Sequence, residues 1–165
     1  MPTFILNPLP SGAPLLHPET ALTLISDGPR PCRRCLRNAE RGEPLLLLPY
    51  DPFTTASPYR GEGPIFVHAT GCDLAEPRPG ELCEQTQGRL LSVRAFDRRA
   101  MLLGAEVIPG EQLAARANAL LAGEVAFLHV HFAAPGCFAF RIDACAPAPR
   151  AARDDLAPVA QLHAA

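Results

Sequence analysis

Four residues of this chain have the types and the spacing of a metal site: Cys32, Cys35, His68 and Cys72. The Cys-x2-Cys spacing lets a tight turn direct two thiolates at one metal ion. The segment "HATGC" adds an imidazole and a third thiolate, and its Ala-Thr-Gly sequence is able to turn the chain back at the end of a strand. Together the two segments predict a closed zinc site with three thiolates and one imidazole.

The same cysteines allow two other interpretations, which the sequence leaves open. Four arginines lie beside the first pair and would offset the charge of thiolates: Arg30, Arg33, Arg34 and Arg37. Cys32 and Cys35 could therefore cycle between dithiol and disulfide. However, a thioredoxin-like pair follows a strand and opens a clear helix, for which "PCRRCLRNAERGE" provides only a turn or two. In the third interpretation the thiols are ordinary residues of a turn that organises the next strand.

A second group of candidates surrounds the segment "HVH". His129 and His131 project from the same face of a predicted strand. The four-residue connection "AAPG" sets His131 opposite Phe138 and leaves Cys137 pointing away from both histidines. The histidines are then expected to lie among Phe127, Phe138 and Phe140. This surface either floors a pocket or fills part of a core.

Three turn residues are further candidates for such a pocket: Tyr50, Tyr59 and Arg60, which flank two proline turns. Exposed residues of this composition also occur in ordinary turns. We find no glycine-rich phosphate loop, no nucleophile elbow and no recognisable carboxylate pair. Two classes of function remain: a binding module for a small molecule or protein, and a thiol- or metal-dependent enzyme in which His68 assists Cys72 or Cys35.

The elements that must position these residues are mostly strands. Alternating and apolar runs predict strands at 45–48, 64–69, 90–96, 101–107, 125–132 and 137–143, after a first strand in "TFILNPL". One amphipathic helix is expected at about 111–121, where Leu113, Ala117, Leu120 and Leu121 form one stripe. The predicted fold is α+β, with a mainly antiparallel sheet and a proline-rich N-terminal region.

Length and composition predict the domain organisation, the classes of partner and the location of the protein. The 165 residues predict one globular domain at 1–143, followed by an Ala/Pro-rich mobile tail at 144–165. The net charge is −2 and the arginines are spread along the chain, so we expect no nucleic-acid partner. No apolar run approaches the ~18 residues of a membrane helix, and "MPTFILNPLPSGAPLL" is a poor signal peptide, so we expect a cytoplasmic protein and no membrane partner.

Several long segments also resemble a known family. They are "CRRCLRNAERGEPLLLLPYDPF", "SPYRGEGPIFVHATGC", "LLSVRAFD" and "VAFLHVHFAAPGCFAFRID", and together they are similar to the bacterial domain-of-unknown-function family numbered 1203 over about residues 25–143. The resemblance implies a small cytoplasmic bacterial domain with no assigned molecular function. It supplies no catalytic residues, and it picks out Cys32, Cys35, His68 and Cys72 as one set.

Overall fold

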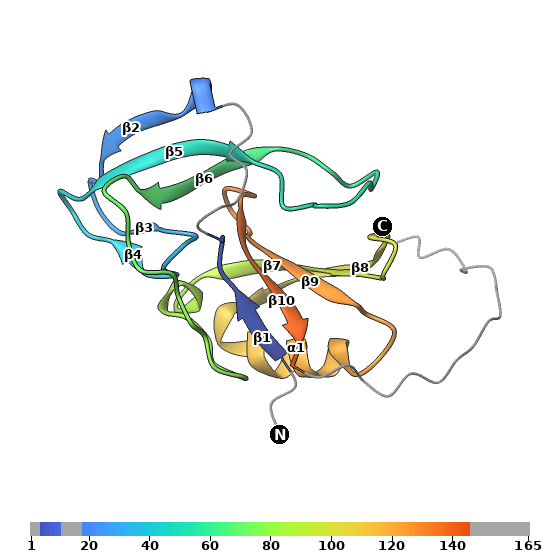
Figure 1. Ribbon diagram of the computed structural model, residues 1–165. Helices are drawn as coiled ribbons and strands as arrows, with labels where there is room; N and C mark the ends of the chain where they lie inside the picture. Colours follow the sequence, from blue (N-terminus) through green and yellow to red (C-terminus); the bar gives the residue numbers. More distant parts are fainter. Residues whose placement is uncertain (1–3, 11–17, 146–165) are drawn as a thin grey trace.

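The computed structural model describes residues 4–10 and 18–145, which form two antiparallel sheets and a two-stranded ribbon (Figure 1). The larger sheet contains β1 (Phe4–Asn7), β7 (Leu90–Phe96), β8 (Leu102–Pro109), β9 (Phe127–Phe132) and β10 (Phe138–Ala144), in the order β1-β10-β9-β7-β8. The smaller sheet contains β2 (Leu22–Ile25), β5 (Pro44–Tyr50) and β6 (Gly63–His68), in the order β2-β5-β6. The ribbon pairs β3 (Arg30–Pro31) with β4 (Asn38–Ala39).

The predicted α+β class is confirmed, and each predicted strand corresponds to a strand of the structure. The strands nevertheless divide between two sheets, because β5 pairs with β6 and β2, and neither β5 nor β6 pairs with β7–β10. Residue alternation shows which face of a strand is buried but not which sheet it joins. The short strands β2, β3 and β4 were not predicted, since they contain two to four residues each.

The main core lies between the larger sheet and the helix α1 (Leu113–Leu121), which follows the short 3-10 turn η3 (Gly110–Gln112). The predicted stripe is present: Leu113, Ala117 and Leu121 are buried, because positions four residues apart lie on one face of a helix. A Cβ atom on Gly110 would lie 1.8 Å from the carbonyl oxygen of Thr86, in the 3-10 turn η2 (Glu84–Thr86). The close approach of η2 to the start of the helix therefore requires glycine at this position.

The opposite face of the larger sheet carries polar and aromatic side chains. Arg94 pairs in register with His129, and Phe96 pairs with Phe127. We call this surface the histidine face; it is covered by the smaller sheet and by the loop of residues 51–62 (Figure 1). The predicted register between His131 and Phe138 is found, but a bulge between Phe138 and Phe140 moves Phe140 into the main core. Phe140 is therefore not a neighbour of the histidines, contrary to our expectation.

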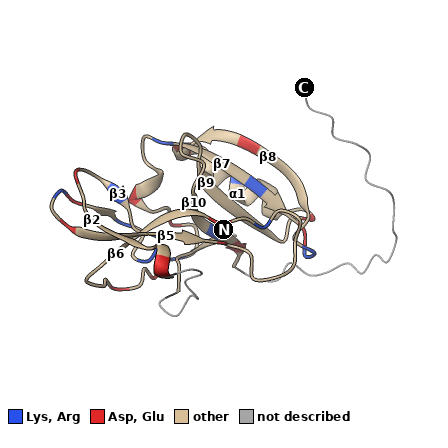
Figure 2. Ribbon diagram, turned by 90° about the horizontal axis from the view of Figure 1, so that it is seen from above, with Lys and Arg blue, Asp and Glu red and all other residues tan. Residues whose placement is uncertain are grey.

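Acidic and basic residues are interspersed over the loops and strand ends in Figure 2. Within the two described ranges, no helix has both the length and the apolar character needed to cross a bilayer. The predicted mobile tail lies outside the described residues from position 146 onward. Ala144 still belongs to β10, and Cys145 is exposed.

Candidate functional site

Cys32 and Cys35 lie in the turn between β3 and β4, which we call the Cys turn (residues 32–37). The amide of Cys32 donates to the carbonyl of Arg37 at 3.0 Å, and the amide of Leu36 donates to the carbonyl of Cys32 at 3.1 Å. Leu36 adopts a positive φ of 55°, a conformation that bulky residues rarely adopt. Its side chain is buried in the main core, so tertiary packing holds the turn in this shape.

Pairing between β5 and β6 carries the second half of the motif to this turn. His68 is the last residue of β6 and pairs with Leu45. The amide of Arg33, inside the Cys turn, donates to the carbonyl of Phe66 on β6 at 3.0 Å. Beyond His68, Gly71 has a φ of +84°, which lets the chain reverse and return Cys72 toward the turn. The turn predicted for "ATG" therefore exists in the structure.

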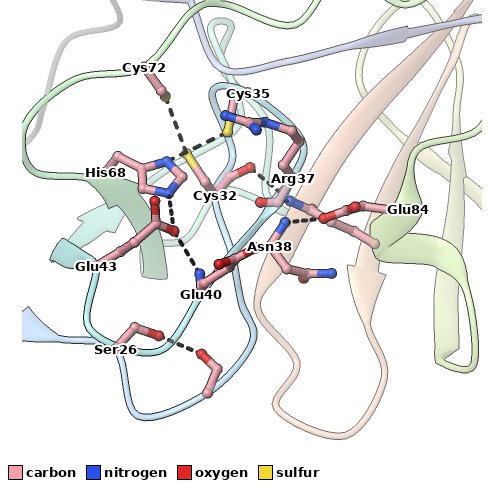
Figure 3. Close-up of polar contacts among 12 residues, drawn as sticks. Ser26, Cys32, Cys35, Arg37, Asn38, Glu40, Glu43, His68, Cys72 and Glu84 are labelled. Carbon is pink, nitrogen blue, oxygen red and sulfur yellow. Dashed lines mark hydrogen bonds and ion pairs between the residues drawn. The ribbon is translucent and has the colours of Figure 1, made fainter.

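The four candidate ligands point toward one another (Figure 3). One donor atom from each residue lies within 4.8 Å of the other three. The Sγ atoms of Cys32 and Cys72 are 3.7 Å apart, and Cys35 Sγ is 3.6 Å from His68 Nδ1. In a tetrahedral zinc site, bond lengths of ~2.3 Å to sulfur and ~2.0 Å to nitrogen separate two sulfurs by ~3.8 Å and a sulfur and a nitrogen by ~3.5 Å. The two shortest separations match this geometry.

The cluster is also shielded from water. Cys32 is 0% exposed, Cys35 is 8% exposed and His68 is 7% exposed, while Cys72 is partly buried. The second ring nitrogen of His68, Nε2, lies 3.4 Å from a carboxylate oxygen of Glu43. A carboxylate that accepts from the other ring nitrogen is the usual partner of a metal-bound histidine, because it fixes the ring orientation and tautomer. Such a tautomer leaves Nδ1 as an acceptor facing the three sulfurs.

The side chain of Gln85 supports the Cys turn from outside. This residue is fully buried, and its Nε2 donates to the carbonyls of Cys32 and Arg37, each at 2.9 Å. The two carbonyls bracket the Cys turn, so one amide group restrains both of its ends. Each carbonyl already accepts from a backbone amide of the turn, so Gln85 adds a second hydrogen bond to each and reinforces the shape of the Cys turn.

The three thiols do not ionise independently. A hydrogen bond from Cys35 lowers the pKa of Cys32 to about 4. The same hydrogen bond raises the pKa of Cys35, and burial raises the pKa of Cys72. Without a cation, the cluster therefore favours one thiolate and two thiols at neutral pH. A bound divalent cation would remove the remaining protons, because a coordinating thiol is deprotonated.

The four arginines near the motif take different positions. Contact with Cys35 raises the pKa of Arg37, whose guanidinium lies beside this thiol in Figure 3, and the charge of Arg34 offsets a small part of the burial that raises the pKa of Cys72. Arg30 instead forms an ion pair with Asp27 at 2.8 Å. The side chain of Arg33 points away from the sulfurs and toward the larger sheet. Two of the four predicted neighbours thus place positive charge at the cluster.

Arg33 is the largest fully buried side chain of the described chain. Its Nε donates to the carbonyl of Phe138 at 2.7 Å, and its Nη2 lies 3.1 Å from Cys137 Sγ. The guanidinium also stands 5.1 Å from the ring centre of Phe132. Burial lowers the pKa of Arg33, but these acceptors and the ring face solvate the charge in place of water. Arg33 thus ties the Cys turn to the β9–β10 hairpin.

A cavity of about 350 Å³ lies between the histidine face and the loop of residues 51–62. Four of the predicted pocket residues line it, Tyr50, Tyr59, His129 and His131. Arg60 does not line it, because its guanidinium pairs with Asp51 at 2.7 Å. Burial lowers the pKa of His129 to about 3 and that of His131 to about 4, so both rings are neutral at pH 7.

Sequence reasoning missed four residues that shape these two sites: Glu43, Gln85, Arg94 and the buried role of Arg33. Gln85 is 53 positions from its partner Cys32, and Arg33 is 105 positions from Phe138. Single residues at such separations leave no periodic signal in the sequence. Arg94 had a usable signal, since alternation in "SVRAF" places it on the same face as Phe96.

Comparison with known proteins places the chain in one family. Residues 29–144 match the family model described as "Protein of unknown function (DUF1203)". This range contains the whole Cys/His cluster and all of the residues that line the cavity. No curated protein and no solved structure gave a significant match.

Proposed function

The chain belongs to the DUF1203 family, and we propose that it is a small binding domain whose Cys/His cluster holds one structural zinc ion. The observation that carries the proposal is the convergence of Cys32, Cys35, His68 and Cys72, whose donor atoms lie within 4.8 Å of one another in a shielded site. Three thiolates and one imidazole form a common ligand set for structural zinc. The soft sulfur donors favour zinc over calcium, magnesium or manganese.

A structural role fits this ligand set better than a catalytic one. A catalytic zinc site keeps a position open for water or substrate, whereas four protein donors fill a tetrahedral shell. Arg37 and Arg34 offset the charge of −1 that three thiolates and one divalent cation produce. The widest separation between donors exceeds the zinc-bound value by ~1 Å. Metal binding is therefore expected to draw the ligands together and to stabilise the fold.

The redox alternative receives less support. The thiolate that attacks a disulfide must be accessible as well as ionised. Cys32 has the lowered pKa but is 0% exposed, and it lies against Cys72 as well as Cys35. A pair that cycles between thiol and disulfide has no use for a third thiol and an imidazole at the same point.

The binding part of the proposal rests on the cavity beside the histidine face. Its volume of about 350 Å³ lies within the range of small-molecule sites, and several aromatic residues line it. We also propose that the domain works in the bacterial cytoplasm, since all six cysteines are free. Fractionation of the source cells should recover the chain with cytoplasmic marker proteins; recovery with the periplasm would contradict this location.

The decisive experiment is the metal content of protein purified without a histidine tag. Elemental analysis should give about one zinc per chain for the wild type and for Cys145→Ser, which removes an exposed thiol outside the cluster. Cys35→Ser should contain far less zinc and unfold at a lower temperature. Wild-type protein expressed with added zinc that carries no metal would refute the structural zinc ion.

A further inference from the structure

The cavity beside the histidine face has walls from two parts of the chain. Tyr50, Phe53 and Tyr59 approach from the smaller sheet and its loop, while Phe96 and Phe138 belong to the larger sheet. The rings of Phe53 and Phe96 meet edge to face at 5.2 Å, and those of Tyr50 and Phe138 lie 5.7 Å apart. Aromatic walls of this kind stack on planar, apolar groups. The body of a suitable ligand is therefore a flat ring system.

One cation, Arg94, lines this aromatic cavity. Its side chain is half-buried, and its Nε lies 3.4 Å from Ser92 Oγ, the long limit of a hydrogen bond. None of the ion pairs among the described residues involves Arg94. A guanidinium presents a planar fork of donors that matches a carboxylate in two parallel hydrogen bonds. Arg94 is therefore placed to receive the anionic group of a ligand.

The two histidines add neutral polar atoms to the cavity floor. His129 is 1% exposed, and neither of its ring nitrogens has a hydrogen-bond partner among the described residues. A buried polar group without a partner is costly, and native structures usually reserve such groups for a purpose. His131 Nδ1 lies 3.0 Å from the carbonyl of Gly136, so it donates there and leaves Nε2 as an acceptor. His131 Nε2 can therefore accept a hydrogen bond from a polar substituent, while the nitrogens of His129 lie buried among aromatic rings beside it.

A second charged residue, Glu62, also lines the cavity. Glu62 is exposed to solvent, where water and salt screen its repulsion of an anion. Arg94 is more deeply buried, so its attraction is screened less. Of the two charged residues that line the cavity, Arg94 therefore acts more strongly on an anion in its inner part, and the nearby Arg141 adds to this positive charge.

We propose that this cavity binds a small planar organic acid, with its ring system against the aromatic side chains that line the cavity and its carboxylate on Arg94. The inference rests on the proposed function, because it names the chemical class of ligand for the binding domain. The volume of about 350 Å³ accommodates one or two fused rings with a short acidic substituent. His131 then selects among such acids by the position of a further polar group.

The test uses the full zinc-loaded chain and two probes of the same shape, 2-naphthoate and its neutral analogue 2-naphthamide. The chain has no tryptophan, so naphthalene emission reports binding without an indole background. We expect 2-naphthoate to bind at least ten times more tightly than the amide. Arg94→Gln should weaken binding of the acid at least tenfold and leave binding of the amide unchanged.

The matched control is Arg98→Gln, which removes an exposed arginine from the turn after β7. It should change neither affinity. Should Arg94→Gln fail to fold, NMR of the wild type decides: addition of 2-naphthoate must shift the ring resonances of His129 and His131, and a titration that leaves them unmoved overturns the proposal.

Failure of this inference is distinguishable from failure of the proposed function, since zinc is measured in the same samples. Equal binding of the acid and the amide would overturn the anionic class while keeping a small-molecule domain. Absence of binding by either probe, in protein with one zinc per chain, would overturn the ligand class and leave the structural zinc ion intact.

Discussion

The two sheets bury their apolar surface by different means. The larger sheet packs one face against α1, and sixteen buried residues form a continuous core between them. Among the described residues no α-helix packs on the smaller sheet, and its core contains seven buried residues, two of which are Cys32 and Cys35. Small cores rarely provide enough hydrophobic stabilisation on their own, and metal ions often replace the missing surface. A cross-link would therefore stabilise the fold more at the Cys turn than in the main core.

Metal removal should have the largest effect and fall on the smaller sheet. When free zinc is ~1,000 times the dissociation constant, binding adds about 4 kcal/mol to the free energy of unfolding. A chelator strong enough to strip the site should therefore lower the melting temperature by roughly 10 °C. Differential scanning calorimetry with and without the chelator measures this shift. If the melting temperature is unchanged although zinc has left the protein, the smaller sheet does not depend on the metal ion for its stability.

A cavity in the main core should cost slightly less and leave the metal in place. Leu128 is fully buried between β7 and β10, so Leu128→Ala should lower the free energy of unfolding by about 3 kcal/mol. Urea titration measures the loss, and Leu74→Ala, at an exposed leucine, should stay within about 0.5 kcal/mol. The Leu128→Ala protein should still hold one zinc per chain. Zinc loss from it would mean that the two cores are one cooperative unit.

Acid should weaken the histidine face, which belongs to the larger sheet but faces the smaller one. Burial lowers the pKa of His129 to about 3, below its unfolded value of ~6.5. The unfolded chain therefore binds the proton more readily, and stability falls as the pH drops from about 6.5 toward 3. Each such histidine contributes a slope of ~1.4 kcal/mol per pH unit.

His129→Phe should reduce the slope between pH 6 and pH 5 by about that amount, measured by urea titration at each pH. Acid also protonates the zinc ligands, but the wild type and the variant share this effect, so it cancels in the difference. Equal slopes would show that His129 is already protonated in the folded protein.

Removal of the C-terminal segment should have the smallest effect. The composition of residues 146–165, rich in alanine and proline, is not that of a packed core. A chain that ends at residue 145 should match the full chain within about 0.5 kcal/mol in the free energy of unfolding. Thermal melts of both chains provide the measurement. A melting temperature that is many degrees lower for the shortened chain would show that residues 146–165 stabilise the fold.

The sequence predicted the strands, the helix and the candidate metal-site residues because each is marked by a pattern of residues that lie close together in the chain. The stripe of Leu113 and Ala117 identified α1, and the pairing of two Cys/His segments identified the cluster. The partition of strands between two sheets depends on side chains that meet across long stretches of chain. So does the bulge at Phe138, which depends on the exact pairing of β9 with β10 and moved Phe140 to the other face. Such features follow from tertiary packing, which alternation alone does not encode.

The position of Arg33 has a consequence for the order in which the domain assembles during synthesis. All four residues of the cluster have been synthesised once residue 72 is added, but two acceptors of Arg33, Cys137 and Phe138, lie 104 and 105 positions after it. Until they appear, the guanidinium keeps its water, because an unpaired charge is not buried. The Cys turn is therefore expected to dock onto the larger sheet last, when the β9–β10 hairpin closes over Arg33 and the main core closes around Leu36.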